Sequence, residues 1–230
     1  MPTRLEDYEM FPDSAIDDNG ELVHLTLMGE AEPVTFQEAI KKDVWLEAMR
    51  EELKAIERNK TWELASLPNG KIAIKVKWVF KNKLKPDGSI AKHKVRLVAK
   101  SFIQKEGYDY KEVFAPVARF ETVRLIVALA SWKGWKLCQM DVKSTFLNGP
   151  LEEEVYVQQP PGFETVGQED KVLKLKKALY RLKQAPRAWN KRINSFLTDS
   201  GFKKCIVEHG VYVKFLKNDE DLLLCLYVDD

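Results

Sequence analysis

The pattern of apolar and polar positions predicts a helix and then a hairpin in the first half of the chain. From residue 35 to residue 59 apolar side chains recur at helical spacing, and Thr35 with Glu38 makes a capping box at the start. Over residues 74–84 and again over 90–100, apolar residues alternate with basic ones, and KPDGS between them has the composition of a tight turn. We therefore expect a long amphipathic helix followed by a two-stranded hairpin with one apolar and one basic face.

The second half of the chain predicts helices separated by short strands. An apolar helix is expected in ETVRLIVALASWKGW, and it leads into a strand at residues 136–142. EEEVYVQQPPGF reads as a short strand ended by prolines, and APRAWNKRINSFLTDSG as a helix with Pro186 in its first turn and Gly201 as its stop. Last come HGVYVKFLK and LLLCLYVDD, which the polar sequence NDED joins into a second hairpin.

Charge is segregated along the chain, although the net charge is only +2. Residues 1–33 carry one basic and nine acidic side chains, a balance of −8, whereas residues 71–105 carry eleven basic and one acidic, a balance of +10. Residues 171–192 add nine basic side chains and no acidic one. Two such segments favour a polyanionic partner, because neutralised phosphates release counterions; for either segment alone, a solvated lysine face is the alternative.

Composition disfavours export and membrane insertion. The longest apolar run, residues 222–228, is far shorter than the roughly 20 residues that span a bilayer, and the N-terminus lacks the pattern of a signal peptide. The first 32 residues show no clear periodicity, so we expect a loosely ordered acidic segment ahead of a globular unit over residues 33–230. Three cysteines lack disulfide or zinc spacing and are expected to be reduced core residues: Cys138, Cys205 and Cys225.

Three aspartates stand where predicted strands end. Asp141 ends the strand at residues 136–142, and Asp229 with Asp230 ends the last strand. If these strands are neighbours, the carboxylates converge at one sheet edge, where their mutual repulsion asks for a hard divalent cation such as magnesium. Two such ions about 4 Å apart would activate an attacking hydroxyl and stabilise a leaving phosphate oxygen. The alternative is that Asp141 caps a helix and the other two form a solvated turn.

The motifs around these aspartates resemble, in order, the reverse transcriptase of copia-type retrotransposons. The resemblance covers about residues 33–230 and implies an α+β polymerase fold with a basic fingers hairpin and an antiparallel palm sheet backed by helices. It also implies RNA-directed DNA polymerase activity. The motifs that carry it are NKTWEL, KWVFKNKLKPDGS, KVRLVAK, YKEVFAPVARFETVR, QMDVKSTFLNG, EEEVYVQQPPGF, YRLKQAPRAW and YVDD.

The resemblance further implies a metal site and a sugar contact. Asp141, Asp229 and Asp230 match a catalytic triad that holds two Mg²⁺ ions, for which Mn²⁺ can substitute, with the Val142 carbonyl as an extra ligand. Phe146 falls where such enzymes place an aromatic ring against the sugar of the incoming nucleotide, and a ring there can exclude a 2′-hydroxyl. A phenylalanine of the hydrophobic core is the alternative for Phe146.

Basic residues are expected to bind phosphates. Arg96 fits a triphosphate clamp, since a guanidinium can grip two phosphate oxygens at once, and Lys92 with Lys94 could assist. Neither basic segment needs contacts to base edges, because pairing selects the nucleotide. The residues expected near the template and primer are Lys183, Gln184 and Arg187.

The chain departs from the family pattern at several positions. Arg181 and Ser101 stand where the family usually has glycine, and Asn190 where it usually has an aromatic residue. A bulky residue at a position that needs positive φ strains the turn. Because the sequence ends at YVDD, we expect the next palm strand, the thumb and any ribonuclease H domain to be absent, which puts turnover by this chain alone in doubt.

Three functions fit these observations. The first is a reverse transcriptase domain within a longer polyprotein, with an RNA template, a DNA primer and product, and deoxynucleoside triphosphates as partners, and with other Gag or Pol segments nearby. The second is a catalytically inactive copy that keeps some nucleic-acid binding. The third is a basic binding module with structural aspartates, against which Asp141 together with YVDD argues. The resemblance implies no membrane and a location in cytoplasmic virus-like particles.

Overall fold

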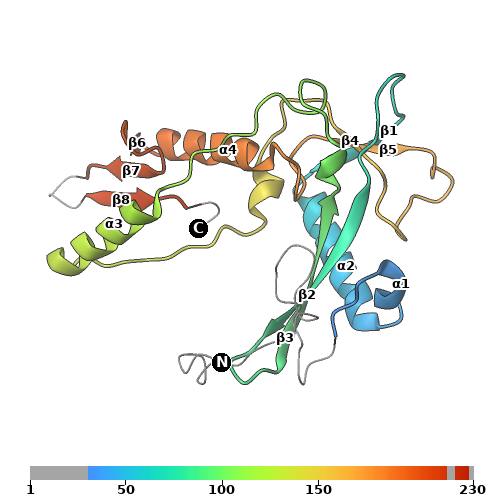
Figure 1. The fold of residues 1–230 in the computed structure, drawn as a ribbon, viewed down its shortest axis with the longest axis horizontal. Helices are drawn as coiled ribbons and strands as arrows, with labels where there is room; N and C mark the ends of the chain where they lie inside the picture. Colours follow the sequence, from blue (N-terminus) through green and yellow to red (C-terminus); the bar gives the residue numbers. More distant parts are fainter. Residues whose placement is uncertain (1–30, 217–220, 228–230) are drawn as a thin grey trace, which may run out of the picture.

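The computed structural model describes residues 31–216 and 221–227 (Figure 1). Asp229 and Asp230 lie outside the described residues, and so does the predicted acidic segment apart from residues 31 and 32. The described part is an α+β fold whose sheets are antiparallel, as the sequence predicts.

The predicted N-terminal helix is present as two pieces, α1 (Phe36–Ala39) and α2 (Asp43–Arg58). The capping box forms as expected: the Glu38 N–H donates to the Thr35 hydroxyl, and the Glu38 carboxylate accepts from the Thr35 N–H. The apolar stripe of α2 is buried, which fixes this helix to the rest of the fold. Its buried members are Trp45, Ala48, Met49 and Ile56.

The basic hairpin consists of β2 (Val76–Leu84) and β3 (Ile90–Ala99). Its register sets Val79 opposite Arg96 and Lys81 opposite Lys94, so basic side chains share one face. The other face is apolar and packs on α2, where the Phe80 ring lies 5.4 Å from the ring of Trp45. This arrangement confirms the two-faced hairpin.

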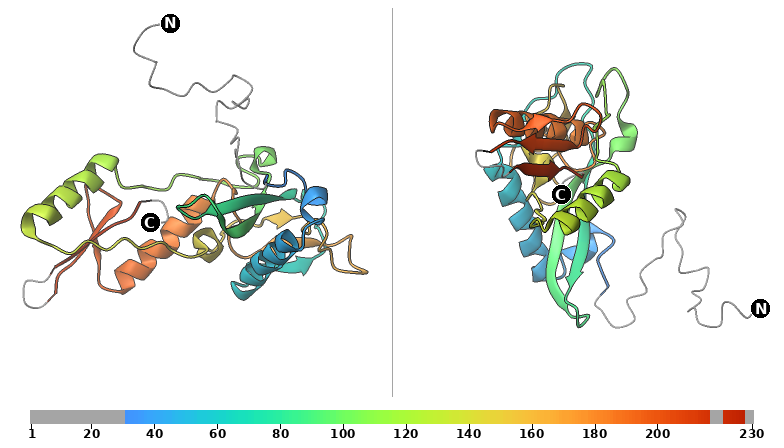
Figure 2. Two further views of the ribbon diagram at one scale, coloured as in Figure 1. Left: turned by 90° about the horizontal axis from the view of Figure 1, so that it is seen from below. Right: turned by 90° about the vertical axis from the view of Figure 1, so that its left-hand side faces the viewer.

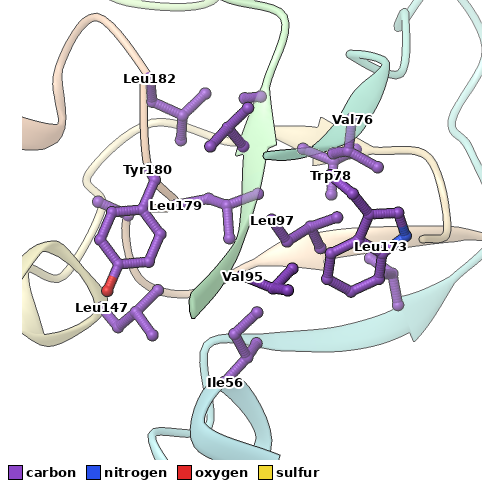
Figure 3. Close-up of a cluster of buried hydrophobic side chains, with 14 of the residues drawn as sticks. Ile56, Val76, Trp78, Val95, Leu97, Leu147, Leu173, Leu179, Tyr180 and Leu182 are labelled. Carbon is purple, nitrogen blue, oxygen red and sulfur yellow. The ribbon is translucent and has the colours of Figure 1, made fainter. Parts of the chain in front are cut away.

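A small sheet completes the main core. Its strands are β1 (Trp62–Ala65), β5 (Val172–Leu175) and β4 (Tyr156–Val157), in the order β1-β5-β4. Figure 3 shows Ile56 of α2, Leu97 of β3 and Leu173 of β5 converging on one apolar cluster. We call α1, α2, the hairpin and this sheet the packed lobe.

The other end of the molecule is formed by α3 (Phe120–Lys133) and by the sheet of β6 (Lys203–Lys204), β7 (Val211–Lys214) and β8 (Leu222–Cys225) (Figures 1 and 2). We call this end the open lobe. Helix α4 (Ala185–Asp199) joins the two ends. Its first turns contribute Ala185 and Ala188 to the main core, and Leu197 belongs to a second, smaller cluster.

The predicted strand at residues 136–142 is wrong. After Gly134 ends α3 in a left-handed conformation, the chain runs without regular structure back toward the short helix η4 (Thr145–Asn148) (Figure 1). The side chains of Leu137 and Met140 are 60% and 62% exposed. The physical reason is that a strand needs a neighbour to complete its hydrogen-bond ladder, and no described strand pairs with this segment.

The cysteines also differ from expectation. Cys138 is exposed within the irregular segment, whereas Cys205 and Cys225 are partly buried, so none is a fully buried core residue. All three are free thiols. Apolar neighbours in the sequence suggested burial, but the open lobe leaves many of those neighbours uncovered.

Candidate functional site

A cleft of about 950 Å³ opens where α2, the hairpin and the segment before η4 meet. The basic face of the hairpin supplies one wall and acidic side chains of α2 supply another. Such clefts commonly hold small ligands, and polar groups on their walls fix the ligand's orientation. The predicted site residues among its lining are Lys92, Lys94, Arg96, Asp141, Val142 and Phe146.

Arg96 is exposed on the basic wall and contacts Tyr180. Its guanidinium lies 5.1 Å from the centre of the Tyr180 ring, a cation–π contact that holds a planar cation without neutralising it. Burial lowers the pKa of Lys94, and the neighbouring Arg96 adds to this effect. Lys92 differs, because its ammonium pairs with Glu51 at 2.8 Å. Arg96 and Lys94 are therefore better placed than Lys92 to meet an incoming anion.

Tyr180 is a site residue that sequence reasoning missed. It is 9% exposed and contacts two predicted residues, Arg96 as above and Phe146, whose ring centroid lies 6.1 Å away in an edge-on arrangement. The signal that could have found it is its place at the start of the motif YRLKQAPRAW, within the basic segment 171–192. Its contacts link the hairpin wall of the cleft to the η4 side.

Phe146 lies on η4 and lines the cleft while packing against the main core. Ser144, with φ of 56°, turns the chain into this short helix. The Thr145 hydroxyl donates to the Val142 carbonyl and closes the turn. These local bonds hold the ring of Phe146 at the cleft, so it combines a core contact with a cleft surface.

Asp141 is exposed at the end of the irregular segment and lines the same cleft. Its charge reaches Lys94, since it partly offsets the lowering of the Lys94 pKa. Among residues 31–216 and 221–227 no group of three potential metal-ligating side chains is found. Asp229 and Asp230 lie outside the described residues, so their predicted convergence with Asp141 stays a prediction.

The acidic wall contains one unusual carboxyl group. Burial raises the pKa of Glu52 to about 7, against the opposing effects of a hydrogen bond from the Leu97 N–H and of the nearby Arg96 and Lys94. Glu51, one residue earlier, shows the opposite: its hydrogen bond with Lys92 lowers its pKa. Two adjacent carboxyl groups on α2 thus differ in charge near neutral pH.

The predicted template residues do not line this cleft within the described part of the chain. Gln184 is only 2% exposed, and its amide donates to the Asp109 carbonyl at 2.9 Å and accepts from Gln104 at 3.0 Å. The Lys183 ammonium lies over the ring of Tyr110, 4.9 Å from its centre. These bonds hold the loop around residues 104–110 against the start of α4.

Arg187 and the positions that depart from the family pattern are also placed. Arg187 pairs with Glu112 at 2.6 Å. Arg181 has φ of 66°, the left-handed region that glycine tolerates best, so the usual glycine has a clear backbone reason there. Ser101 begins the short helix η3 (Ser101–Ile103), and the Asn190 amide donates to the Pro116 carbonyl at 3.3 Å.

Comparison with known proteins links the chain to a family. Residues 59–230 match the family described as reverse transcriptase (RNA-dependent DNA polymerase). The chain is 40% identical over 210 residues to the retrovirus-related Pol polyprotein from transposon TNT 1-94 of Nicotiana tabacum, which covers 90% of this chain and 16% of that protein. It is 38% identical over 206 residues to the corresponding polyprotein from transposon RE2 of Arabidopsis thaliana, covering 89% of this chain and 14% of that protein.

A shorter relative is an uncharacterized mitochondrial protein of Arabidopsis thaliana, 45% identical over 105 residues, which are 46% of this chain and 61% of that protein. No solved structure matches the chain. The chain spans about one sixth of the length of the tobacco polyprotein. Within residues 31–216 and 221–227, no helix is both long and apolar enough to cross a membrane.

Proposed function

Because the chain belongs to the reverse transcriptase (RNA-dependent DNA polymerase) family, we propose that its cleft binds the incoming nucleotide of an RNA-directed DNA polymerase. The family matches confirm the resemblance to copia-type elements drawn from the motifs. The observation that carries the proposal is that Arg96, Phe146 and Asp141, which are far apart in sequence, line one cleft. Each offers a different chemistry that a nucleotide substrate requires.

Arg96 and Lys94 bind the triphosphate in this proposal. The Tyr180 ring contacts the Arg96 guanidinium by a cation–π interaction, which uses none of the N–H donors, so these donors can bind phosphate oxygens. Two cations on neighbouring positions of one strand face can share the charge of a polyphosphate. Lys92 would first have to leave Glu51, so its part is secondary.

Phe146 is the proposed selector for deoxyribose. Its ring is held between Tyr180 and the main core, so it cannot move aside easily for an additional oxygen. A rigid ring beside the sugar excludes the 2′-hydroxyl that distinguishes ribonucleotides. Phe146 therefore acts by shape and not by charge.

Magnesium would be held by Asp141 and the Val142 carbonyl, together with Asp229 and Asp230. A carboxylate and a backbone carbonyl are oxygen donors of the kind that magnesium prefers, so the described part of the donor set fits this ion. Two bound ions would neutralise the triphosphate and activate the primer hydroxyl for in-line displacement. The chain's own part is to hold these oxygens beside the cationic wall and to keep the sugar in place.

We infer a right-hand polymerase arrangement within residues 33–230, with the hairpin as the fingers, and α3, α4 and the β6-β7-β8 sheet as parts of the palm. Residues 1–32 form a separate acidic segment in this proposal. Other Pol or Gag segments and a cytoplasmic virus-like particle follow from the resemblance alone and remain expectations.

Lys183 and Arg187 are proposed to contact the phosphates of the template and primer. Both are engaged with protein groups, so phosphate binding would replace the Glu112 pair of Arg187 and the Tyr110 contact of Lys183. Gln184 is buried, so we infer that it supports the template side by fixing the loop around residues 104–110. Because these contacts are electrostatic, affinity for primer-template should fall steeply with salt.

The test is extension of a DNA primer on an RNA template with magnesium and deoxynucleoside triphosphates. The chain is assayed alone and fused to the segment that follows the matched region in the tobacco polyprotein. Asp141→Asn should abolish extension, whereas Asp170→Asn, on an exposed loop far along the chain, should not. Absence of extension by both wild-type proteins would contradict the polymerase proposal, and extension that survives Asp141→Asn would contradict the metal site.

A further inference from the structure

Glu52 carries a carboxyl group that lines the cleft and has no role among the proposed nucleotide contacts. It lies on α2 and is partly buried. Its Oε1 accepts a hydrogen bond from the Leu97 N–H of β3 at 3.4 Å. Leu97 directly follows Arg96, so this bond ties the acid to the backbone of the strand that carries the proposed triphosphate clamp.

The charges around Glu52 come from three segments. From β3, Arg96 and Lys94 both act on its carboxyl group and favour the ionised form, whereas burial favours the neutral form more strongly and raises the pKa to about 7. The other charged or titratable side chains that line the cleft are Glu47, Glu51, Lys54, Glu57 and Arg58 on α2, Lys83, Lys92 and His93 on the hairpin, Asp141 and Lys143 before η4, and the phenol of Tyr180.

We propose that Glu52 is a positioning residue for Arg96 and a counter-charge that sets how tightly the cleft binds a polyphosphate. As a neutral acid it supports the strand through Leu97 and leaves the two cations of β3 to the ligand. As a carboxylate it attracts Arg96 and Lys94 and subtracts one positive charge from the cleft, which weakens anion binding. The inference rests on the proposed function, because it takes Arg96 as the group that meets the polyphosphate.

Glu51 supplies a matched control on the same helix. It is exposed and hydrogen-bonded to Lys92, which lowers its pKa, so it stays ionised throughout the neutral range. Replacing Glu51 with glutamine removes one negative charge from the cleft, as replacing an ionised Glu52 does. The difference is that the effect of Glu51 does not depend on pH between 6 and 8.

The experiment measures binding of inorganic tripolyphosphate to the whole chain by calorimetry between pH 6 and pH 8. Wild type is compared with Glu52→Gln, Glu51→Gln and Arg96→Gln. The quantity of interest is the ratio of the wild-type Kd to the variant Kd at each pH, because the ligand's own titration cancels in it. Glutamine keeps a side-chain oxygen for the Leu97 N–H, and Glu52→Met repeats the measurement if Glu52→Gln does not fold.

For Glu52→Gln the ratio should be close to one at pH 6 and should rise to on the order of fivefold at pH 8, the size expected for one unit charge acting across a cleft open to water. For Glu51→Gln the ratio should exceed one by a factor that is constant over this range. A constant ratio for Glu52→Gln, while Arg96→Gln weakens binding, would overturn the inference and leave the proposed clamp intact. If Arg96→Gln leaves the affinity unchanged, the proposed clamp itself is wrong.

Discussion

Helices α2 and α3 show how differently the two lobes use their apolar side chains. By sequence α3 is the more apolar helix, yet Ala130 is its only buried residue among those described. The more polar α2 buries Trp45, Ala48, Met49 and Ile56. On α3, by contrast, Leu125 is 67% exposed and Trp132 77% exposed.

The comparison shows that a helix buries its apolar side chains when they lie on one face and that face packs against another apolar surface. The number of apolar residues alone does not decide their burial. The apolar residues of α2 fall on one face, and that face meets the apolar side of the hairpin. Helix α3 is apolar on several sides, and none of its residues belongs to either buried cluster of the described chain. The packed lobe supplies Arg96 and Glu52 to the cleft, and Tyr180, from the turn before α4, is buried in the same main core.

The largest expected effect is a difference in stability between two variants, each with one side chain shortened in one of the lobes. Ile56→Ala should destabilise the protein by about 2–5 kcal/mol, because Ile56 is fully buried in the main core. Leu125→Ala should change stability by less than about 0.5 kcal/mol, because that side chain is mostly exposed. Chemical denaturation measures both. Equal losses would show that the open lobe is packed as tightly as the first.

The next largest expected effect is a loss of stability when a side chain is added where η4 meets α4, the helix that joins the two lobes. A Cβ atom on Gly149 would lie 2.6 Å from the Trp189 backbone nitrogen, so Gly149→Ala should push α4 away from η4 and cost about 1–3 kcal/mol. Gly167→Ala is the control: it meets no atom within 4 Å, and only its positive φ opposes the change. Thermal unfolding should separate the two variants. A smaller loss for Gly149→Ala than for Gly167→Ala would argue against close packing at the junction.

A smaller effect depends on pH. Because the pKa of Glu52 is raised to about 7 in the folded protein, the folded state binds this proton more tightly than the unfolded state does. The contribution of protonated Glu52 to the free energy of unfolding is therefore fully present below pH 4.5, and it is lost as the pH rises to about 7. Glu52→Gln should match wild type near pH 4.5 and exceed its stability by about 1–2 kcal/mol at pH 8.

The measurement for Glu52 is the free energy of unfolding of both proteins across this range. Glu51→Gln should not reproduce the gain at pH 8, since Glu51 is exposed and paired with Lys92. If the difference between wild type and Glu52→Gln were the same at both ends of the range, burial of Glu52 would not be the cause.

The smallest effect concerns backbone strain beside the cleft. Arg181→Gly should stabilise the protein by less than about 1 kcal/mol, because relief of the left-handed conformation is partly offset by the entropy of glycine in the unfolded chain. Lys60, with φ of 53°, offers a second position for the same change on an exposed surface. A loss of stability at both positions would contradict the strain argument.

The sequence predicted the elements whose signal is local. The capping box, the stripe of α2 and the alternation of the hairpin each lie within a short window, and all three are found. Strands β1 and β5 were missed because each has four residues and gains its stability from pairing Trp62 with Leu175, more than a hundred positions apart. The strand at residues 136–142 was wrong for the converse reason, since its apolar residues have no described partner strand.

The site was predicted to a similar extent. Family motifs led to Arg96, Phe146 and Asp141, and the structure brings these three to one cleft. Tyr180 begins the motif YRLKQAPRAW but received no role, and Glu52 lies in none of the motifs, because the importance of both residues comes from contacts across α2, β3 and the turn before α4. The roles of Lys183, Gln184 and Arg187 stay predictions, although the buried amide of Gln184 suggests support rather than direct contact.

We infer that template-directed DNA synthesis takes place in the cleft between α2, the hairpin and the segment before η4. The most direct measurement offers a primed RNA template with each of the four bases in turn at the first open position, and identifies the deoxynucleotide that is added. We expect the added nucleotide to follow the template base and Asp141→Asn to stop the addition. Addition that ignores the template base, or that continues in Asp141→Asn, would contradict this inference.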